Sequence, residues 1–191
     1  INVQLEVDGF INADGVIVAE EIDFEDDDRP IEIEAPVQSI DLGNGVVTLL
    51  GIRVQMTATT RFEDFSVAQA SPFRAEDIRV GDYLEIIGTP AEDAGTDVVA
   101  TKIERADDDD SDVSLQGFVE SLAPPDLVIL GVTVQTTADT EFELRDNDDA
   151  SQAEFFGTIQ VGELVDVEGI QVSEAAILAD EVEQEDDEID D

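Results

Sequence analysis

The sequence predicts an all-β protein made of tandem small five-to-six-stranded Greek-key or OB-like β-barrels, preceded by an incomplete repeat that forms a β-hairpin. Two observations predict this fold class. A block of about 80 residues occurs twice along the chain, and its apolar residues alternate with polar ones, which is the period of a half-buried strand. A small β-sandwich is the alternative architecture.

The repeat is clearest in a segment that joins two predicted strands. Residues 50–63 return as residues 130–143, an offset of 80. Two further blocks return in the same order, with residues 80–88 matching 161–169 and residues 98–104 matching 177–183.

The last block has a third copy near the N-terminus, at residues 17–23. Residues 1–28 hold only the last two segments of a repeat, with strands predicted at 3–9 and 16–23. We therefore predict three domains. Residues 1–28 are the incomplete repeat, 29–110 the first full barrel, and 111–191 the second full barrel with an acidic C-terminal tail.

Each full repeat is predicted to contain five strands. Gly43-Asn44-Gly45 forms a hairpin turn, and Pro124-Pro125-Asp126 takes the equivalent place in the other copy. A short helix around residues 73–78 is a candidate in the connection between the third and fourth strands. The strands of the first repeat are expected near 31–40, 46–50, 52–57, 82–88 and 97–105. Four aromatic residues are expected in the core, with Phe62 and Phe142 plugging the barrels and Phe73 and Phe156 covering one end.

Composition restricts the possible functions. The chain has 50 Asp and Glu against 8 Lys and Arg, a formal net charge of −42. Such a surface repels nucleic acid and anionic membranes and attracts cations or a cationic partner. Because there is no Cys and no His, thiolate or imidazole chemistry and zinc-finger ligands are excluded, and we expect no enzymatic activity.

No apolar run approaches the roughly 20 residues of a membrane-spanning helix, so we expect no membrane span. The first residue is Ile1 rather than Met, which fits removal of a leader peptide and fits a trimmed or incomplete chain equally well. The expected location is therefore extracellular or at the cell surface of a bacterium, with the periplasm as the alternative.

The strand and turn motifs together resemble the bacterial repeats known as domain of unknown function 5666. In the second repeat these motifs are residues 115–119, 130–134, 140–142, 161–169 and 179–183. The first repeat departs from the pattern where Ala35-Pro36 stands in place of the expected glycine, which puts the geometry of that first strand in doubt. The resemblance implies an exported β-barrel module and no catalytic residue.

Runs of acidic residues lie where the repeats meet and in one long loop. Closely spaced carboxylates can supply the six to eight oxygens that calcium takes, although a solvated acidic linker and adaptation to high salt are alternatives. No cofactor other than calcium is expected. The candidate metal ligands are Asp26, Asp27, Asp28, Asp107, Asp108, Asp109, Asp110, Asp112, Asp146, Asp148 and Asp149.

The incomplete repeat suggests assembly. An isolated hairpin is marginal in water and leaves unpaired edges, so a second copy of the chain could supply the missing strands and build a filament. The hairpin could instead pack on its own chain or belong to a longer array. The candidate assembly residues are Val3, Leu5, Val7, Val16, Val18 and Ile22.

These observations favour a non-enzymatic extracellular structural protein that self-assembles as a filament, surface layer or matrix by β-strand addition, with calcium at its acidic junctions. The alternative is a monomeric secreted or periplasmic acidic module that binds divalent cations or a cationic partner.

Overall fold

The computed structural model describes residues 4–11, 17–25, 31–91, 95–107, 112–145, 147 and 149–185. The chain forms two compact units. The first contains the antiparallel hairpin of β1 (Gln4–Ile11) and β2 (Ile17–Glu25), and the second contains all the other strands. Strands β1 to β15 and one α-helix account for nearly all the regular structure described, so the predicted all-β fold class is confirmed.

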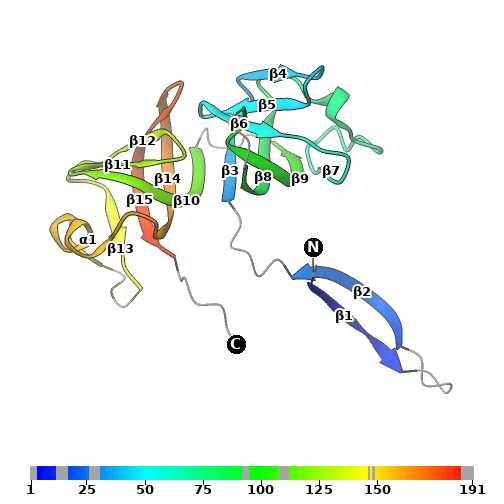
Figure 1. Ribbon diagram of the computed structural model, residues 1–191, viewed down its shortest axis with the longest axis horizontal. Coiled ribbons are helices and arrows are strands. Elements are labelled where there is room, and N and C mark those ends of the chain that lie inside the picture. Colours follow the sequence, from blue (N-terminus) through cyan, green and yellow to red (C-terminus); the bar gives the residue numbers. More distant parts are fainter. Residues whose placement is uncertain are drawn as a thin grey trace. The chain divides into compact units, whose positions relative to one another are not determined.

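The C-terminal half of the second unit is a closed five-stranded barrel (Figure 1). It consists of β10 (Asp112–Ala123), β11 (Asp126–Ile129), β12 (Val132–Gln135), β14 (Leu164–Ser173) and β15 (Ala176–Gln184). The order is β11-β12-β15-β14-β10, and β10 also pairs with β11, which closes the barrel. Strand β12 runs parallel to β15 and the other pairs are antiparallel. This is the five-stranded Greek-key arrangement of the OB fold.

The connection between β12 and β14 contains the short strand β13 (Glu141–Glu143), which pairs parallel with β15, and helix α1 (Gln152–Thr158), which lies beside β13 (Figure 1). Ser151 caps the helix, because its hydroxyl accepts the Glu154 amide while the Glu154 carboxylate accepts the Ser151 amide.

In the N-terminal half of the second unit, the strands have the same neighbours as the equivalent strands of the C-terminal half. Its elements are β3 (Ile31–Pro36), β4 (Ser39–Asp41), β5 (Val46–Leu49), β6 (Ile52–Gln55), β7 (Arg61–Asp64), η1 (Ala75–Asp77), β8 (Tyr83–Pro90) and β9 (Val98–Ala106), where η1 is a 3-10 turn. The sheet order is β3-β8-β9-β6-β5-β4, with β7 parallel to β9. The candidate helix around residues 73–78 is thus confirmed as a single turn.

The first strand of this half differs from the prediction of one strand over residues 31–40. It breaks after Pro36, and β4 starts at Ser39. Gly117 occupies the position equivalent to Ala35, inside the unbroken strand β10. A Cβ on Gly117 would lie 2.7 Å from Cγ2 of Ile129, so glycine permits the close approach that keeps β10 continuous.

Alternation of apolar and polar residues explains the core. In β3 the side chains of Ile31, Ile33 and Ala35 are fully buried, while the residues between them are half-buried. β-branched residues fit such a pleated, one-sided surface well. Phe73 and Phe142 are buried as predicted, and Phe62 is half-buried.

The aromatic ring that covers the end of the second barrel is not the predicted one. The prediction placed Phe156 there, yet Phe155 is the fully buried ring and Phe156 only packs against the edge of the core. The reason is that α1 directs both rings toward Phe142, with centroids 5.1 and 6.1 Å away.

One irregularity recurs in three hairpins. The register shifts by one residue at Gly9 opposite Ala19, at Gly88 opposite Ala100, and at Gly169 opposite Ala179. At Gly88 a Cβ would lie 2.6 Å from the carbonyl oxygen of Val99. Glycine is therefore needed where the two strands approach most closely.

Strands β3 and β10 join the two barrels by an antiparallel ladder. Leu115 pairs with Ile33, and these two residues occupy equivalent positions in the repeat. Ser114 pairs with Glu34 and Gln116 with Glu32, so the ladder is symmetric about the Ile33–Leu115 pair. The second unit therefore contains a pseudo-twofold contact in which each barrel offers the same strand to the other.

Candidate functional site

Most of the predicted metal ligands lie outside the described residues, namely Asp26, Asp27, Asp28, Asp108, Asp109, Asp110, Asp146 and Asp148. The other three are dispersed. An oxygen of Asp107 accepts a hydrogen bond from the Val67 amide at 2.9 Å, Asp112 begins β10, and Asp149 follows Asn147 in the exposed loop. Within the part of the chain that is described, no three acidic side chains gather in a way that could hold a metal ion.

Of the predicted assembly residues, Val3 and Val16 also lie outside the described residues. Leu5, Val7, Val18 and Ile22 all belong to the hairpin ladder, where Val7 pairs with Ile22. Leu5 pairs with Phe24 and Val18 with Phe10. The structure thus brings the described assembly residues into one two-stranded element.

A row of seven glutamates and one serine crosses eight strands of the second unit, and this feature was not predicted from the sequence. Each member is the register partner of the next, and register partners on adjacent strands have Cβ atoms about 4.5–5.5 Å apart. We call this set the acidic row. In strand order β13, β15, β14, β10, β3, β8, β9 and β7 it consists of Glu141, Glu181, Glu168, Ser114, Glu34, Glu85, Glu104 and Glu63.

The sequence contained a signal for this row. Glutamates occupy the polar positions of alternating strands, as in Ile31-Glu32-Ile33-Glu34 and Leu84-Glu85-Ile86. Alternation fixes which face of a strand they occupy. It does not give the register between strands, which decides whether the carboxylates align, so the row could only be found in the structure.

The electrostatics of the row follow from burial and from like charge. Burial first, and then repulsion from Glu104 and Glu34, raise the pKa of Glu85 to about 7. Burial likewise raises the pKa of Glu34, with further contributions from Asp166 and Glu168 across the barrel junction. Glu85 therefore resists full ionisation at neutral pH, and a cation beside it would relieve the repulsion.

The two barrels differ in the cations that they place next to the row. In the first barrel the Lys102 ammonium lies 2.8 Å from Glu104, and hydrogen bonds that include this contact outweigh burial and lower the pKa of Glu104. In the second barrel the equivalent position is Glu181. Burial raises the pKa of Glu181, followed by repulsion from Glu143.

Because the second barrel has Glu181 where the first has Lys102, the part of the acidic row on the second barrel is the more acidic. Asp166, Glu168, Glu181 and Glu183 line a small cleft of about 60 Å³ on strands β14 and β15. Burial raises the pKa of Glu183, and repulsion from Glu185 is the next largest cause. The cleft is lined by carboxylates alone, whereas the first barrel places its own lysine at the position of Glu181.

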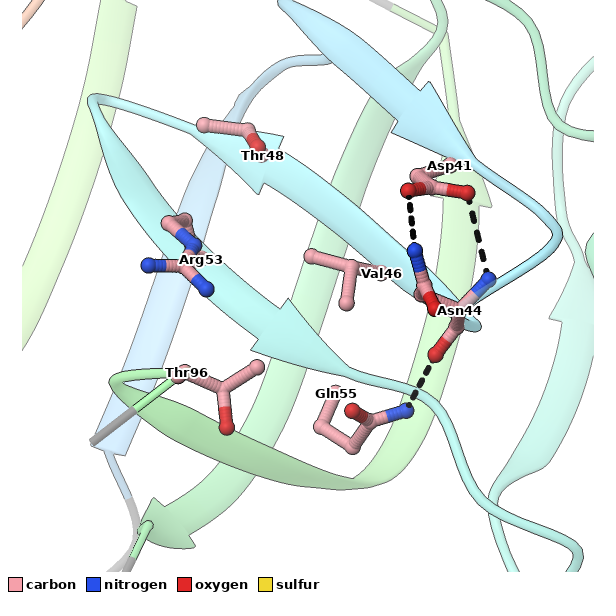
Figure 2. A pocket seen from close by; sticks show the side chains of 8 residues that line it. Asp41, Asn44, Val46, Thr48, Arg53, Gln55 and Thr96 are labelled. Atoms are coloured by element: carbon pink, nitrogen blue, oxygen red, sulfur yellow. Dashed lines mark hydrogen bonds between the residues drawn. The ribbon is translucent and has the colours of Figure 1, made fainter. Parts of the chain in front are cut away.

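A second surface hollow, of about 500 Å³, lies over β5 and β6 (Figure 2). Figure 2 shows that Asp41 accepts two hydrogen bonds from Asn44, while the Asn44 carbonyl accepts one from Gln55. These bonds lower the pKa of Asp41. The polar groups of Asp41, Asn44 and Gln55 in this hollow hold the turn, which is a structural role.

A buried ion pair organises the long loop after β7. The Asp64 carboxylate has no exposed surface and accepts hydrogen bonds from the Arg105 guanidinium, the Ser66 amide and hydroxyl, and the Ala70 amide. Hydrogen bonding to Arg105 is the largest cause that holds the pKa of Asp64 well below its usual range. Asp64 therefore fixes the path of residues 65–70, which is a structural role.

The fold and the acidic row define the class of protein: an all-β chain of OB-like barrels with a strongly anionic sheet face. In sequence comparison, a family described as a domain of unknown function (DUF5666) matches residues 1–23, 34–104 and 116–183. The chain belongs to this family, as its motifs indicated. No curated protein matches the chain in sequence.

Within the described residues, no helix has the length and apolar character needed to cross a membrane.

Proposed function

We propose that this chain is a non-enzymatic structural module of the bacterial cell surface or extracellular matrix, which joins other copies through its β1–β2 hairpin by β-strand addition. The observation that supports the proposal is the pairing of the equivalent hairpins. In the barrels, β8–β9 is flanked by β3 on one side and by β6 and β7 on the other. The hairpin β14–β15 is flanked in the same way by β10, β12 and β13.

The β1–β2 hairpin has the same register shift as these two hairpins, yet no strand among the described residues pairs with its outer edges. Unpaired strand edges attract further strands. A strand from a second copy would satisfy the free amides and carbonyls, and it would add apolar contacts on the alternating positions. Because the two surfaces in such a contact differ, the assembly would grow as a filament.

In this proposal, calcium binds to the acidic runs between the repeats. The runs that contain Asp26–Asp28 and Asp107–Asp112 fall at the ends of the predicted repeats, where successive barrels would meet. Carboxylate oxygens are the ligands that calcium prefers, and binding there would reduce repulsion between modules.

The test is negative-stain electron microscopy with light scattering on the purified full chain, in chelator and in millimolar calcium. A variant with Leu5→Lys and Val18→Lys should prevent strand addition at the hairpin, since lysines on an edge oppose it. Its matched control carries Val161→Lys and Val172→Lys, at exposed sites of the second barrel.

We expect filaments from the natural sequence and from the control, and monomers from the hairpin variant. Monodisperse monomers of the natural sequence in both conditions would refute the assembly proposal, as would filaments from the hairpin variant equal to those of the control.

The acidic row supports a second candidate function, a binding module for a cationic partner. A line of glutamates, interrupted by Ser114 where the barrels join, spans both barrels, and the whole chain carries a net charge of −42. Oligolysine binding followed by calorimetry at low and high salt tests this function. The affinity should fall steeply with salt, because exposed charges are screened beyond about 8 Å at physiological ionic strength. Absence of binding at low salt would rule this function out.

A further inference from the structure

A groove of about 340 Å³ lies at the end of the first barrel, between β7 and the loop that follows it. Phe62, Phe65 and Phe73 line it together with Pro72. Phe65 is 67% exposed, which is unusual for a phenylalanine. The polar residues of the lining are Glu63, Asp64, Gln69 and Ser71.

The second barrel shows how such an end is normally filled. There Phe142, Phe155 and Phe156 form a packed trio with centroids 5.1 to 6.1 Å apart, and Phe155 is fully buried. In the first barrel η1 is a single turn, and the aromatic contact found is between Phe62 and Phe73 at 6.4 Å. The exposed ring of Phe65 is particular to the first barrel, since the equivalent position in the second barrel is Arg145.

The groove is held in shape before any ligand arrives. Asp64 ties the loop down through Ser66, Ala70 and Arg105, and the amide of Val67 is held by Asp107. A site that is already ordered does not lose further conformational entropy on binding.

The chemistry of the groove suits a guanidinium group. The Arg105 guanidinium already lies 4.6 Å from the centre of the Phe73 ring, so an aromatic face here accepts this cation. Glu63 lines the groove and is also the last member of the acidic row, next to Glu104. An incoming arginine could stack on Phe65 and pair with Glu63 at the same time.

We propose that this groove binds an arginine side chain of a cationic peptide, while the remaining basic residues of the peptide follow the acidic row. The proposal rests on the second candidate function above and adds the site and the preferred residue. Arginine is favoured over lysine because its flat guanidinium stacks on aromatic rings and is more weakly hydrated than an ammonium.

The experiment titrates blocked tetra-arginine into the isotopically labelled full chain and follows binding by NMR. Blocked tetra-lysine and a blocked neutral phenylalanine peptide are compared at the same salt concentration. Phe65→Ala and Glu63→Gln alter exposed residues, so both variants should fold. The matched control is Glu143→Gln, which removes one charge at the equivalent position of the second barrel.

Tetra-arginine should shift the signals of Phe65 and Val67, and Phe65→Ala should weaken its binding about two- to fivefold, the range of an exposed cation–π contact. Glu63→Gln should weaken it more than Glu143→Gln, and Phe65→Ala should leave tetra-lysine binding unchanged. If Phe65→Ala and Glu63→Gln bind tetra-arginine as the control does, the groove proposal fails and the acidic row alone binds. Equal binding of the neutral peptide would also overturn it, and no binding of either cationic peptide would overturn both proposals.

Discussion

Thr140 and its counterpart Thr60 show how a single hydroxyl explains a repeated motif. The Thr140 hydroxyl donates to the carbonyl oxygen of Ala179 at 2.8 Å and accepts the amide of Thr137 at 2.9 Å. Thr60 makes the same two bonds, to Ala100 and from Thr57. The threonine two residues before Phe62 or Phe142 thus ties the loop to the last strand of its own barrel.

Replacing Thr140 by valine keeps the shape of the side chain and removes both hydrogen bonds. We expect the free energy of unfolding to fall by about 1–3 kcal/mol, because the buried hydrogen bond from the hydroxyl to the Ala179 carbonyl oxygen is lost. Urea denaturation followed by circular dichroism measures this change. The control is Thr158→Val at the exposed end of α1. An equal effect of the two substitutions would show that the hydroxyl of Thr140 contributes nothing specific.

At the scale of elements, the register shift at Gly88 determines how the β8–β9 hairpin pairs. We expect Gly88→Ala to destabilise the protein by about 1–3 kcal/mol, because the added methyl group would overlap the backbone of Val99. Gly157→Ala is the matched control, since it lies in α1 with no atom within 4 Å of the added Cβ and should stabilise the helix by up to about 1 kcal/mol. Thermal unfolding of both variants measures the difference, and a neutral Gly88→Ala would contradict the close approach.

Several elements were predictable because their signals are local. Alternating residues and the Gly43-Asn44-Gly45 turn gave most strands to within a few residues, as for β5 and β6. Strands β7 and β13 were missed, because each has only three or four residues and pairs with a strand about 40 positions away. Pairing between distant segments depends on the closed sheet and leaves little trace in a short stretch of sequence.

The candidate sites likewise divide into those that a local sequence signal reveals and those that depend on pairing between distant strands. The sequence directed attention to consecutive aspartates such as Asp108–Asp110, whereas the carboxylates that the structure aligns are single glutamates on different strands. Their proximity depends on register, which composition cannot provide. Phe65 was not singled out either, since its exposure depends on the path of the loop around Asp64.

At the scale of the whole molecule, the acidic row couples stability to pH across both barrels. The pKa of Glu85 is raised to about 7 in the folded state, so the fold holds this proton more tightly than the unfolded chain does. Its contribution to stability is complete below about pH 4.5, the ordinary value, and is lost as the pH rises to about 7. Asp64 acts in the opposite sense, because its lowered pKa contributes stability that is lost as the pH falls below its ordinary value of 3.8.

Glu85→Gln should therefore raise the free energy of unfolding at pH 8 and flatten its dependence on pH between about 4.5 and 7. The gain should stay below about 1 kcal/mol, since Glu85 is partly exposed and solvent screens the repulsion. Denaturant melts at several pH values measure it, with Asp180→Asn, on the exposed face of β15, as control. A variant that keeps the natural pH dependence would show that Glu85 does not titrate in this range.

The symmetric ladder between β3 and β10 should hold the two barrels together even when the protein is dilute. Two separate barrels meeting through that contact would come apart as their concentration fell, whereas here a short peptide link keeps each barrel at a high effective concentration for the other. The contact between the two barrels therefore does not depend on the concentration of the protein, and it persists when the chains are dilute.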